Sequence, residues 1–376
     1  MKKIFFILLL GAIGWSVTGG TGCKQAYDPP AIANPGIYLV VDGFINNGPD
    51  STYFTLTHTY ALSDTAQTTP ELHAQVTVQG NDNSTYPLTE TGNGNYGAPI
   101  SGLNSNVAYR LYIKTTAGKE YASDYVSLKV SPPIDSVSWT LNNSGNVQLY
   151  VNTHDPQNNT HYYRWDYQET WEFESTFYAS LQYVHDSVQT YSPNTIYQCW
   201  KSDHSTSIIL ESSAQLAQDV ISLNPLVNMP ATSQQLSVEY SILVRQYALS
   251  QDAFTWWQTM QKNTEQIGSI FGVQPSTNTG NIHSLTDSNE VVIGYVSGGT
   301  IRTQRIFITH QQILPWTYTT QCALTSIPPD SVSYYYQYGF LLVDETMNPA
   351  LRYDVSFASC VDCTLTGSNQ KPSFWP

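Results

Sequence analysis

The sequence has few charged side chains, and cations are the scarcer kind. Lysine and arginine together number 15 against 29 aspartates and glutamates, and the formal net charge is −14 at pH 7. A chain of this charge repels the phosphates of nucleic acids and the anionic headgroups of lipids. We therefore expect no nucleic-acid partner, and attachment to a membrane cannot come from a basic patch.

Long apolar runs are also scarce. The run Ile4 to Val17 follows the positive start Met1-Lys2-Lys3 and is shorter than the roughly 20 residues of a membrane span. Small residues then lead to Gly22-Cys23. This order is typical of a secretory signal peptide, which we place at residues 1–22.

Around Cys23 the sequence resembles a bacterial lipoprotein signal, in which the cysteine at this position is acylated. It departs from that signal at Gly20, where a leucine is usual. Palmitate and related chains would anchor the protein, because each buried CH₂ contributes about 0.8 kcal/mol. Residues 23–36 are rich in proline and are expected to form the lipidated tether. The alternative is an ordinary secreted protein with a cysteine there by chance.

Recognisable catalytic motifs are missing. The eight histidines form no HExxH pattern, and there is no nucleophile elbow. The glycine-rich Gly92–Gly97 segment lies between strand-like runs and is interpreted as a hairpin turn instead of a dinucleotide loop. Glu172 and Glu174 share a face of one strand, as a glycosidase pair might, but exposed strands commonly carry such carboxylates. His283 is interpreted as a hydrogen-bonded loop anchor. We expect no enzyme, no metal site and no cofactor.

Short alternating runs separated by turn residues predict a mainly β fold without a fixed-period repeat. Several such runs over residues 37–131 favour an immunoglobulin-like β-sandwich. The prolines of Ser131–Asp135 mark the predicted boundary. Residues 136–376 are expected to form a larger β-rich domain with a helical insertion near residues 250–266. Ser250 is a good N-cap for that helix, and its apolar stripe runs from Ala253 to Met260 before Gly268.

The stretch His161–Glu174 predicts one long strand around which the second domain is organised. Its odd-numbered side chains are aromatic, whereas its even-numbered side chains are polar and expected to face water. Glu169 is the exception, a carboxylate among the aromatics, and an unpaired charge there would be costly. We predict a structural ion pair between Glu169 and Arg245, with Arg302 and Arg305 as alternative partners.

Four cysteines remain beyond Cys23: Cys199, Cys322, Cys360 and Cys363. An even number in an exported protein favours two disulfides, and three connectivities are open. The single Cys-x-x-Cys also fits a zinc or redox pair, but it has no second such pair to complete a zinc site. We expect the disulfides to fasten the C-terminal segment to the body.

Several stretches recur in order along the chain, among them Leu39–Phe44, Tyr163–Phe173, Gly280–His283 and the tail from Cys360 to Trp375. In these stretches the sequence resembles the domain of unknown function 4249 family, lipoproteins of Bacteroidetes-type cell envelopes. The resemblance implies an immunoglobulin-like domain before a β-rich domain, an outer-membrane location and a TonB-dependent receptor as partner. It supplies no catalytic residues.

A short Asp-Ser/Thr pattern recurs along the chain and resembles the O-glycosylation acceptor of Bacteroidetes-type periplasms. The candidate acceptors are Ser51, Thr65, Ser136, Ser187 and Ser331.

The first functional hypothesis is a non-catalytic outer-membrane lipoprotein that serves a TonB-dependent transporter as accessory or substrate-capturing subunit. The alternative is a cell-surface adhesin or scaffold that binds another envelope protein through its immunoglobulin-like domain. The sequence does not name the ligand.

Overall fold

The computed structural model describes residues 37–60, 69–230, 232–265, 280–347 and 349–376. Within these ranges the chain is mainly β, and the longest helix is α2 (Gln251–Glu265). The predicted fold class, mainly β with a small helical insertion, is confirmed. Apart from Ile37, the described residues belong to one compact unit.

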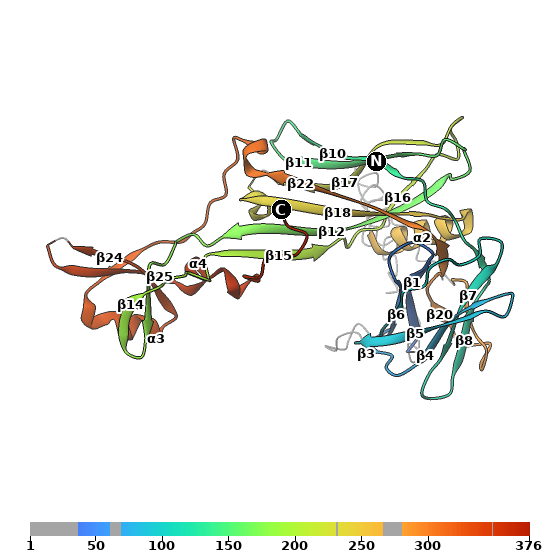
Figure 1. The fold of residues 1–376 in the computed structure, drawn as a ribbon, viewed down its shortest axis with the longest axis horizontal. Helices are drawn as coiled ribbons and strands as arrows, with labels where there is room; N and C mark the ends of the chain where they lie inside the picture. The colour runs from blue at the N-terminus through green and yellow to red at the C-terminus, as the bar shows by residue number, and fades with distance from the viewer. Residues whose placement is uncertain (1–36, 61–68, 231, 266–279, 348) are drawn as a thin grey trace, which may run out of the picture. The chain divides into compact units, whose positions relative to one another are not determined.

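The first sheet follows one continuous path of strands around a single core (Figure 1). In β7, for example, Tyr109, Leu111 and Ile113 alternate with more exposed residues and point into the core. The strands at the two ends of the path, β19 and β20, contact each other, so the sheet is nearly closed. Its strands are β1 (Leu39–Asn46), β2 (Thr52–His58), β3 (Thr69–Pro70), β4 (Gln75–Gly80), β5 (Thr85–Gly92), β6 (Asn95–Ala98), β7 (Ala108–Lys114), β8 (Glu120–Ser123), β9 (Val126–Ser127), β19 (Ile282–Ser284), β20 (Val292–Ile293) and β21 (Ser297–Gly299).

The glycine-rich segment Gly92–Gly97 is part of the hairpin that joins β5 to β6. Asn93 and Gly94 occupy its turn with φ angles of 52° and 73°. Two successive residues with positive φ are typical of a tight hairpin turn. The interpretation of this segment as a turn is therefore confirmed.

Three strands of the first sheet come from residues 282–299, far beyond the predicted boundary. β21 pairs in parallel with β1 and leads directly into a strand of the next sheet. The backbones approach closely here: a Cβ on Gly299 would lie 2.0 Å from the backbone oxygen of Lys129, and one on Gly294 would lie 2.2 Å from that of Val41. Glycine is therefore required at both positions.

The aromatic strand predicted from the sequence is β12 (Tyr162–Glu174), which lies inside a five-stranded sheet (Figure 1). Its odd-numbered aromatic residues are buried in a core shared with a three-stranded sheet, as the alternation predicts. The five-stranded sheet contains β15 (Gln198–His204), β12, β18 (Glu239–Ala248), β22 (Ile301–Thr309) and β16 (Ile209–Ser212). The three-stranded sheet contains β10 (Ile134–Leu141), β11 (Val147–His154) and β17 (Val220–Met229).

The even-numbered face of β12 is exposed at Glu174 and half-exposed from Arg164 to Gln168, but two of its residues are buried where the sequence predicts contact with water. Thr170 and Glu172 are buried, with exposed fractions of 0% and 8%. Trp375, near the end of the chain, covers this face and donates its indole N–H to Oε2 of Glu172 at 3.0 Å. Gln198 donates to the other oxygen of the same carboxyl. At these two positions the prediction was wrong, because the segment that covers Glu172 lies far away in the sequence.

Helix α2 begins after Ser250, as predicted. The backbone N–H of Ala253 donates to Oγ of Ser250 at 3.2 Å, which is the contact of an N-cap. The helix packs against β12 and β16. The side chain of Gln261 donates to the backbone oxygen of Ile208 at 2.6 Å and holds the helix against the residues before β16.

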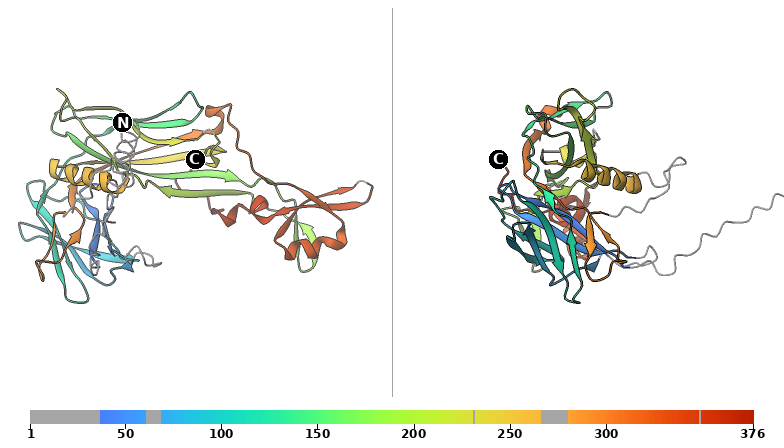
Figure 2. Two further views of the ribbon diagram at one scale, coloured as in Figure 1. Left: turned by 180° about the vertical axis from the view of Figure 1, so that it is seen from behind. Right: turned by 90° about the vertical axis from the view of Figure 1, so that its right-hand side faces the viewer.

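The C-terminal part adds a small sheet that the sequence pattern did not indicate. It consists of β23 (Thr325–Ile327), β25 (Leu351–Phe357) and β24 (Phe340–Met347), with α3 (Val332–Gln337) between them in the chain. The hairpin of β13 (Leu181–Val184) and β14 (Ser187–Thr190) packs on it, and Figure 2 shows this green hairpin beside the orange strands. In the chain the hairpin lies between β12 and β15, whereas the small sheet follows β22.

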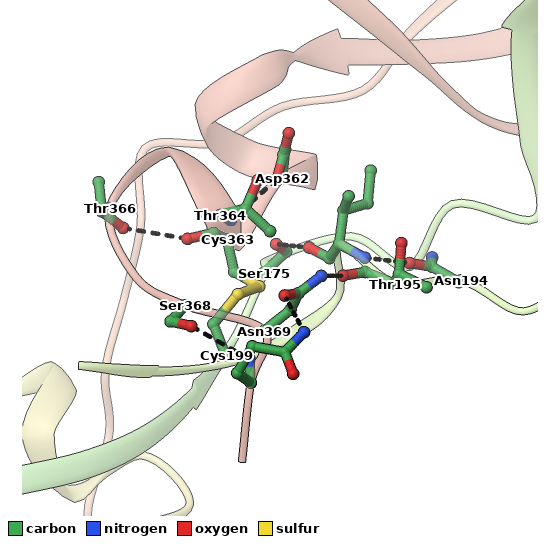
Figure 3. Close-up of a disulfide and its surroundings, with 12 residues drawn as sticks. Ser175, Asn194, Thr195, Cys199, Asp362, Cys363, Thr364, Thr366, Ser368 and Asn369 are labelled. Atoms are coloured by element: carbon green, nitrogen blue, oxygen red, sulfur yellow. Dashed lines mark hydrogen bonds between the residues drawn. A yellow bond between two sulfur atoms is a disulfide. The ribbon is translucent and has the colours of Figure 1, made fainter. Parts of the chain in front are cut away.

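Two cysteine pairs lie at disulfide distance: Cys199 with Cys363, and Cys322 with Cys360, each with a Cα–Cα distance of 5.8 Å. Figure 3 shows the first pair, which joins β15 to the 3₁₀ turn η4 (Cys363–Leu365). Near it, Asn369 donates to the backbone oxygen of Thr195 at 3.0 Å. The C-terminal segment is therefore fastened to the body, as predicted.

Several predictions lie outside the described residues: the signal peptide at 1–22, Cys23, the tether at 23–36, and Thr65 and Gly268. Among the residues that are described, no helix is both long and apolar enough to cross a membrane.

Candidate functional site

Two adjoining hollows of about 390 and 620 Å³ share four charged residues, and together we call them the Arg164 groove. The shared residues are Asp42, Arg164, Asp166 and Arg245. Asp42 comes from β1, whereas the other three come from β12 and β18. A volume in this range suits a small ligand.

Strand register explains why these side chains meet. In the antiparallel pair of β12 and β18, Asp166 lies opposite Arg245 and Arg164 lies opposite Tyr247. Directly opposed residues project to the same face of a sheet. The even-numbered face of β12 and the odd-numbered face of β18 therefore form one wall of the groove.

Arg245 and Asp166 form an ion pair in this wall, with Nε of Arg245 donating to Oδ1 of Asp166. Burial alone would lower the pKa of Arg245, but the adjacent Asp166 carboxylate raises it overall. Each of these two charges is thus largely satisfied by the other.

The predicted ion pair between Glu169 and Arg245 is wrong. Glu169 lies opposite Ile242, and it is three residues from Asp166, so Glu169 and Arg245 point to opposite faces of the sheet. The alternative partners lie elsewhere too: Arg302 donates to the backbone oxygen of Ser131 and Arg305 to Oγ of Ser241.

The buried carboxyl of Glu169 is stabilised by a hydrogen bond instead of an ion pair. It is 7% exposed, and Tyr240 donates its hydroxyl to Oε1 at 2.5 Å. Burial raises the pKa of the Glu169 carboxyl, the Tyr240 hydrogen bond opposes this, and the Asp203 carboxylate raises it further. A raised pKa favours the neutral acid, which needs no ion pair.

Arg164 is the cation of the groove with the more distant ionic partner. Its guanidinium carbon lies 4.3 Å from the ring centre of Tyr247 and 4.4 Å from that of Trp257. Oδ2 of Asp166 is 3.7 Å away, beyond hydrogen-bond distance. Within the described ranges, no protein atom accepts a hydrogen bond from this guanidinium.

Aromatic side chains of α2 and of the segment before β21 line the smaller hollow, that of about 390 Å³. Trp257 packs edge-on against Trp256 with 4.9 Å between ring centres, and Trp256 lies 5.8 Å from Tyr295. Phe254 on the same helix contacts Tyr162 of β12 and holds α2 in place. The amphipathic pattern of α2 thus supplies both the packing and the half-buried ring of Trp257 at the groove.

The other predicted site residues lie away from the groove, apart from Ser51, which lines the larger hollow. Glu172 is covered by Trp375, whereas Glu174 accepts a hydrogen bond from Tyr197 at 2.8 Å. His283 lies on β19 with its Nε2 3.2 Å from Asp124.

The candidate glycosylation residues differ in exposure. Ser187 is exposed, whereas Ser51, Ser136 and Ser331 are only partly so. Ser136 accepts a hydrogen bond from Asn152 at 3.0 Å. Their modification stays a prediction.

Sequence reasoning did not single out Arg164, Asp42 or Trp257. The sequence offered one hint of this site, because Arg164 stands between two aromatic residues of the predicted strand. Which rings cover its guanidinium depends on the register with β18 and on the placement of α2, and neither follows from the sequence pattern.

Comparison with solved structures finds likenesses of low similarity. A cytokine receptor complex has 12% identity and a TM-score of 0.19, with 55% of this chain and 90% of that chain covered. A DUF4785 family protein from Legionella pneumophila has 10% identity and a TM-score of 0.18, with 55% and 52% covered. The Yersinia pseudotuberculosis adhesin InvE has 9% identity and a TM-score of 0.17, with 84% and 72% covered. These TM-scores are too low to support an argument about function.

No curated protein matches the chain. A family model described as "Domain of unknown function (DUF4249)" matches residues 24–305, most of the chain. The chain therefore belongs to the DUF4249 family, as the resemblance in its sequence predicts.

Proposed function

We propose that this protein is an outer-membrane lipoprotein, anchored through Cys23, that serves a TonB-dependent transporter as a non-catalytic accessory or substrate-capturing subunit. The capture role is carried by one observation, the Arg164 groove. A half-buried cation between aromatic rings, with no protein acceptor for its N–H groups among the described residues, suits a ligand-binding site. The partnership with a transporter is supported by the family resemblance.

The anchoring rests on the sequence of the N-terminus. A positive start, a short apolar run and a cysteine after small residues support lipidation at Cys23. The acidic balance of the chain argues against attachment by charge, because anionic headgroups would repel it. Lipid chains on Cys23 would supply the attachment instead.

Cell fractionation of the Cys23→Ser variant tests the anchor. We expect the native protein in the outer-membrane fraction with incorporated palmitate, and the variant without palmitate and outside that fraction. Thr21→Ser, which keeps the cysteine, serves as the matched control and should behave like the native protein. A Cys23→Ser variant that stays in the outer membrane would contradict the proposed anchor.

Extraction in mild detergent tests the partnership. We expect a barrel-type TonB-dependent transporter to co-purify with the native lipoprotein in near-stoichiometric amount. Recovery of the lipoprotein without a transporter would contradict this role and favour the adhesin or scaffold.

A further inference from the structure

We propose that the Arg164 groove binds a small zwitterion, with a free carboxylate and a free ammonium group beside an apolar side chain. This is the chemistry of a free amino acid or a short unblocked peptide. The inference names the ligand class of the capture role and in that sense rests on the proposed function.

Arg164 is arranged to take the carboxylate. Its side chain is only 18% exposed, and rings of Tyr247 and Trp257 lie over the guanidinium at 4.3 and 4.4 Å. Rings that cover the guanidinium leave its edge, where the N–H groups lie, to make hydrogen bonds. A planar guanidinium fork binds a carboxylate through two parallel N–H···O bonds, and the rings hold the fork in one orientation.

The second arginine of the groove does not compete for this carboxylate. Nε of Arg245 donates to Asp166, which lies directly opposite it on the neighbouring strand. Both hollows are lined by this pair and by Arg164. Asp166 accepts the hydrogen bond of Arg245 and lies 3.7 Å from Nη2 of Arg164, too far for a hydrogen bond, so the donors of Arg164 are available to a ligand.

Asp42 supplies the matching position for the ammonium group. It is exposed on β1 and lines both hollows together with Arg164. Within the described part of the chain, no cation forms an ion pair with it. Of the four charged residues common to both hollows, and in the segments that the structure describes, Asp42 has no cationic partner and Arg164 has only the Asp166 carboxylate, 3.7 Å away and shared with Arg245.

Charge balance favours a zwitterion over a simple anion. The whole chain carries a formal charge of −14, so its field repels a ligand with net negative charge. A zwitterion has no net charge and still satisfies Arg164 and Asp42. Two hollows of about 390 and 620 Å³ have room for it, and the rings of Trp256 and Tyr295 offer an apolar wall for its side chain.

Isothermal titration calorimetry on the full chain in detergent tests the inference with the dipeptide phenylalanyl-alanine as probe. Its C-terminal amide lacks the carboxylate, and its N-acetyl form lacks the ammonium group. We expect the free dipeptide to bind at least about tenfold more tightly than either blocked form, since each blocked form loses a charge-assisted hydrogen bond.

Two variants assign the contacts. Arg164→Gln is expected to weaken binding of the free dipeptide about tenfold or more and to leave binding of the amide unchanged. Asp42→Asn is expected to weaken the free dipeptide and to leave the N-acetyl form unchanged. Arg110→Gln is the matched control, because Arg110 also lies over a ring, that of Tyr125 at 4.9 Å, but outside the groove. It should bind like the native protein, and circular dichroism should show all three variants folded.

The inference is overturned if the native chain binds none of the three compounds at millimolar concentration, or binds them all equally. It is also overturned if folded Arg164→Gln binds the free dipeptide as the native chain does. These outcomes leave the fractionation and co-purification experiments untouched, so failure of the ligand class and failure of the proposed function are separate results.

Discussion

Trp375 donates its indole N–H to the carboxyl of Glu172 at 3.0 Å across a sequence separation of 203 residues. The ring of Trp375 also packs edge-on against Phe307 of β22, with 5.4 Å between ring centres. The last residues of the chain thus close the even-numbered face of β12 near its C-terminal end. The same face nearer the start of β12 stays accessible, and there it forms a wall of the Arg164 groove.

Trp375→Ala should therefore destabilise the protein. Loss of a buried indole is expected to lower the free energy of unfolding by about 3–5 kcal/mol, measured by urea denaturation. Trp375→Phe keeps a ring but removes the N–H donor, and we expect a smaller loss of about 1–3 kcal/mol. An Ala variant as stable as the native protein would show that this segment does not cover the sheet.

The disulfide connectivity can be checked by proteolysis without reduction, followed by mass spectrometry. We expect one linked peptide pair with Cys199 and Cys363 and another with Cys322 and Cys360. A link between Cys199 and either Cys322 or Cys360 would contradict the structure.

The two disulfides should differ in their contribution to stability. They close loops with sequence separations of 164 and 38 residues. In the chain-entropy model the longer loop contributes about 1 kcal/mol more. We expect urea denaturation to show a larger loss for the paired substitution Cys199→Ser with Cys363→Ser than for Cys322→Ser with Cys360→Ser. The reverse order would contradict this prediction.

Glu169 should make stability depend on pH. Burial raises the pKa of its carboxyl above the ordinary value of 4.5 in the folded protein. The folded state then holds this proton more tightly than the unfolded chain does. The contribution of the group to stability is therefore complete below pH 4.5 and is lost as the pH rises through the folded-state pKa.

Glu169→Gln keeps an acceptor for Tyr240 but cannot ionise. We expect it to be more stable than the native protein at neutral pH, with a difference that shrinks on acidification, measured by urea midpoints across the pH range. Glu174→Gln, the same substitution at an exposed carboxyl of the same strand, is the matched control and should not be more stable than the native protein at neutral pH. A Glu169→Gln variant that is less stable at neutral pH would indicate an ionised, stabilising carboxylate.

Trp257→Leu tests the stacking on Arg164. Removal of one ring over the guanidinium is expected to weaken binding of phenylalanyl-alanine by a few-fold to about thirtyfold, measured by calorimetry. Tyr125→Leu removes the ring under Arg110 and should leave binding unchanged. Equal binding by the native chain and folded Trp257→Leu would show that this ring does not orient Arg164.

The sequence predicted those features that rest on local pattern. The alternation in His161–Glu174 predicted β12 and its buried aromatic face, and the N-cap at Ser250 predicted the start of α2. The hairpin at Gly92–Gly97 and the even number of cysteines were equally local signals.

Features that depend on long-range placement could not be predicted. The partner of Arg245 is set by the register between β12 and β18, and a shift by one residue would turn its side chain to the other face. Strands β20 and β21 have two and three residues, too few to show a period. The Arg164 groove draws its residues from β1, β12, β18 and α2, and no local pattern joins those segments.

A crystal structure of the full chain soaked with phenylalanyl-alanine is the decisive test of the zwitterion site. We predict the carboxylate of the dipeptide in a two-bond contact with the guanidinium of Arg164, its ammonium group at Asp42 and its ring beside Trp256 and Tyr295. Dipeptide bound elsewhere, or a groove that stays empty at saturating dipeptide, would contradict it.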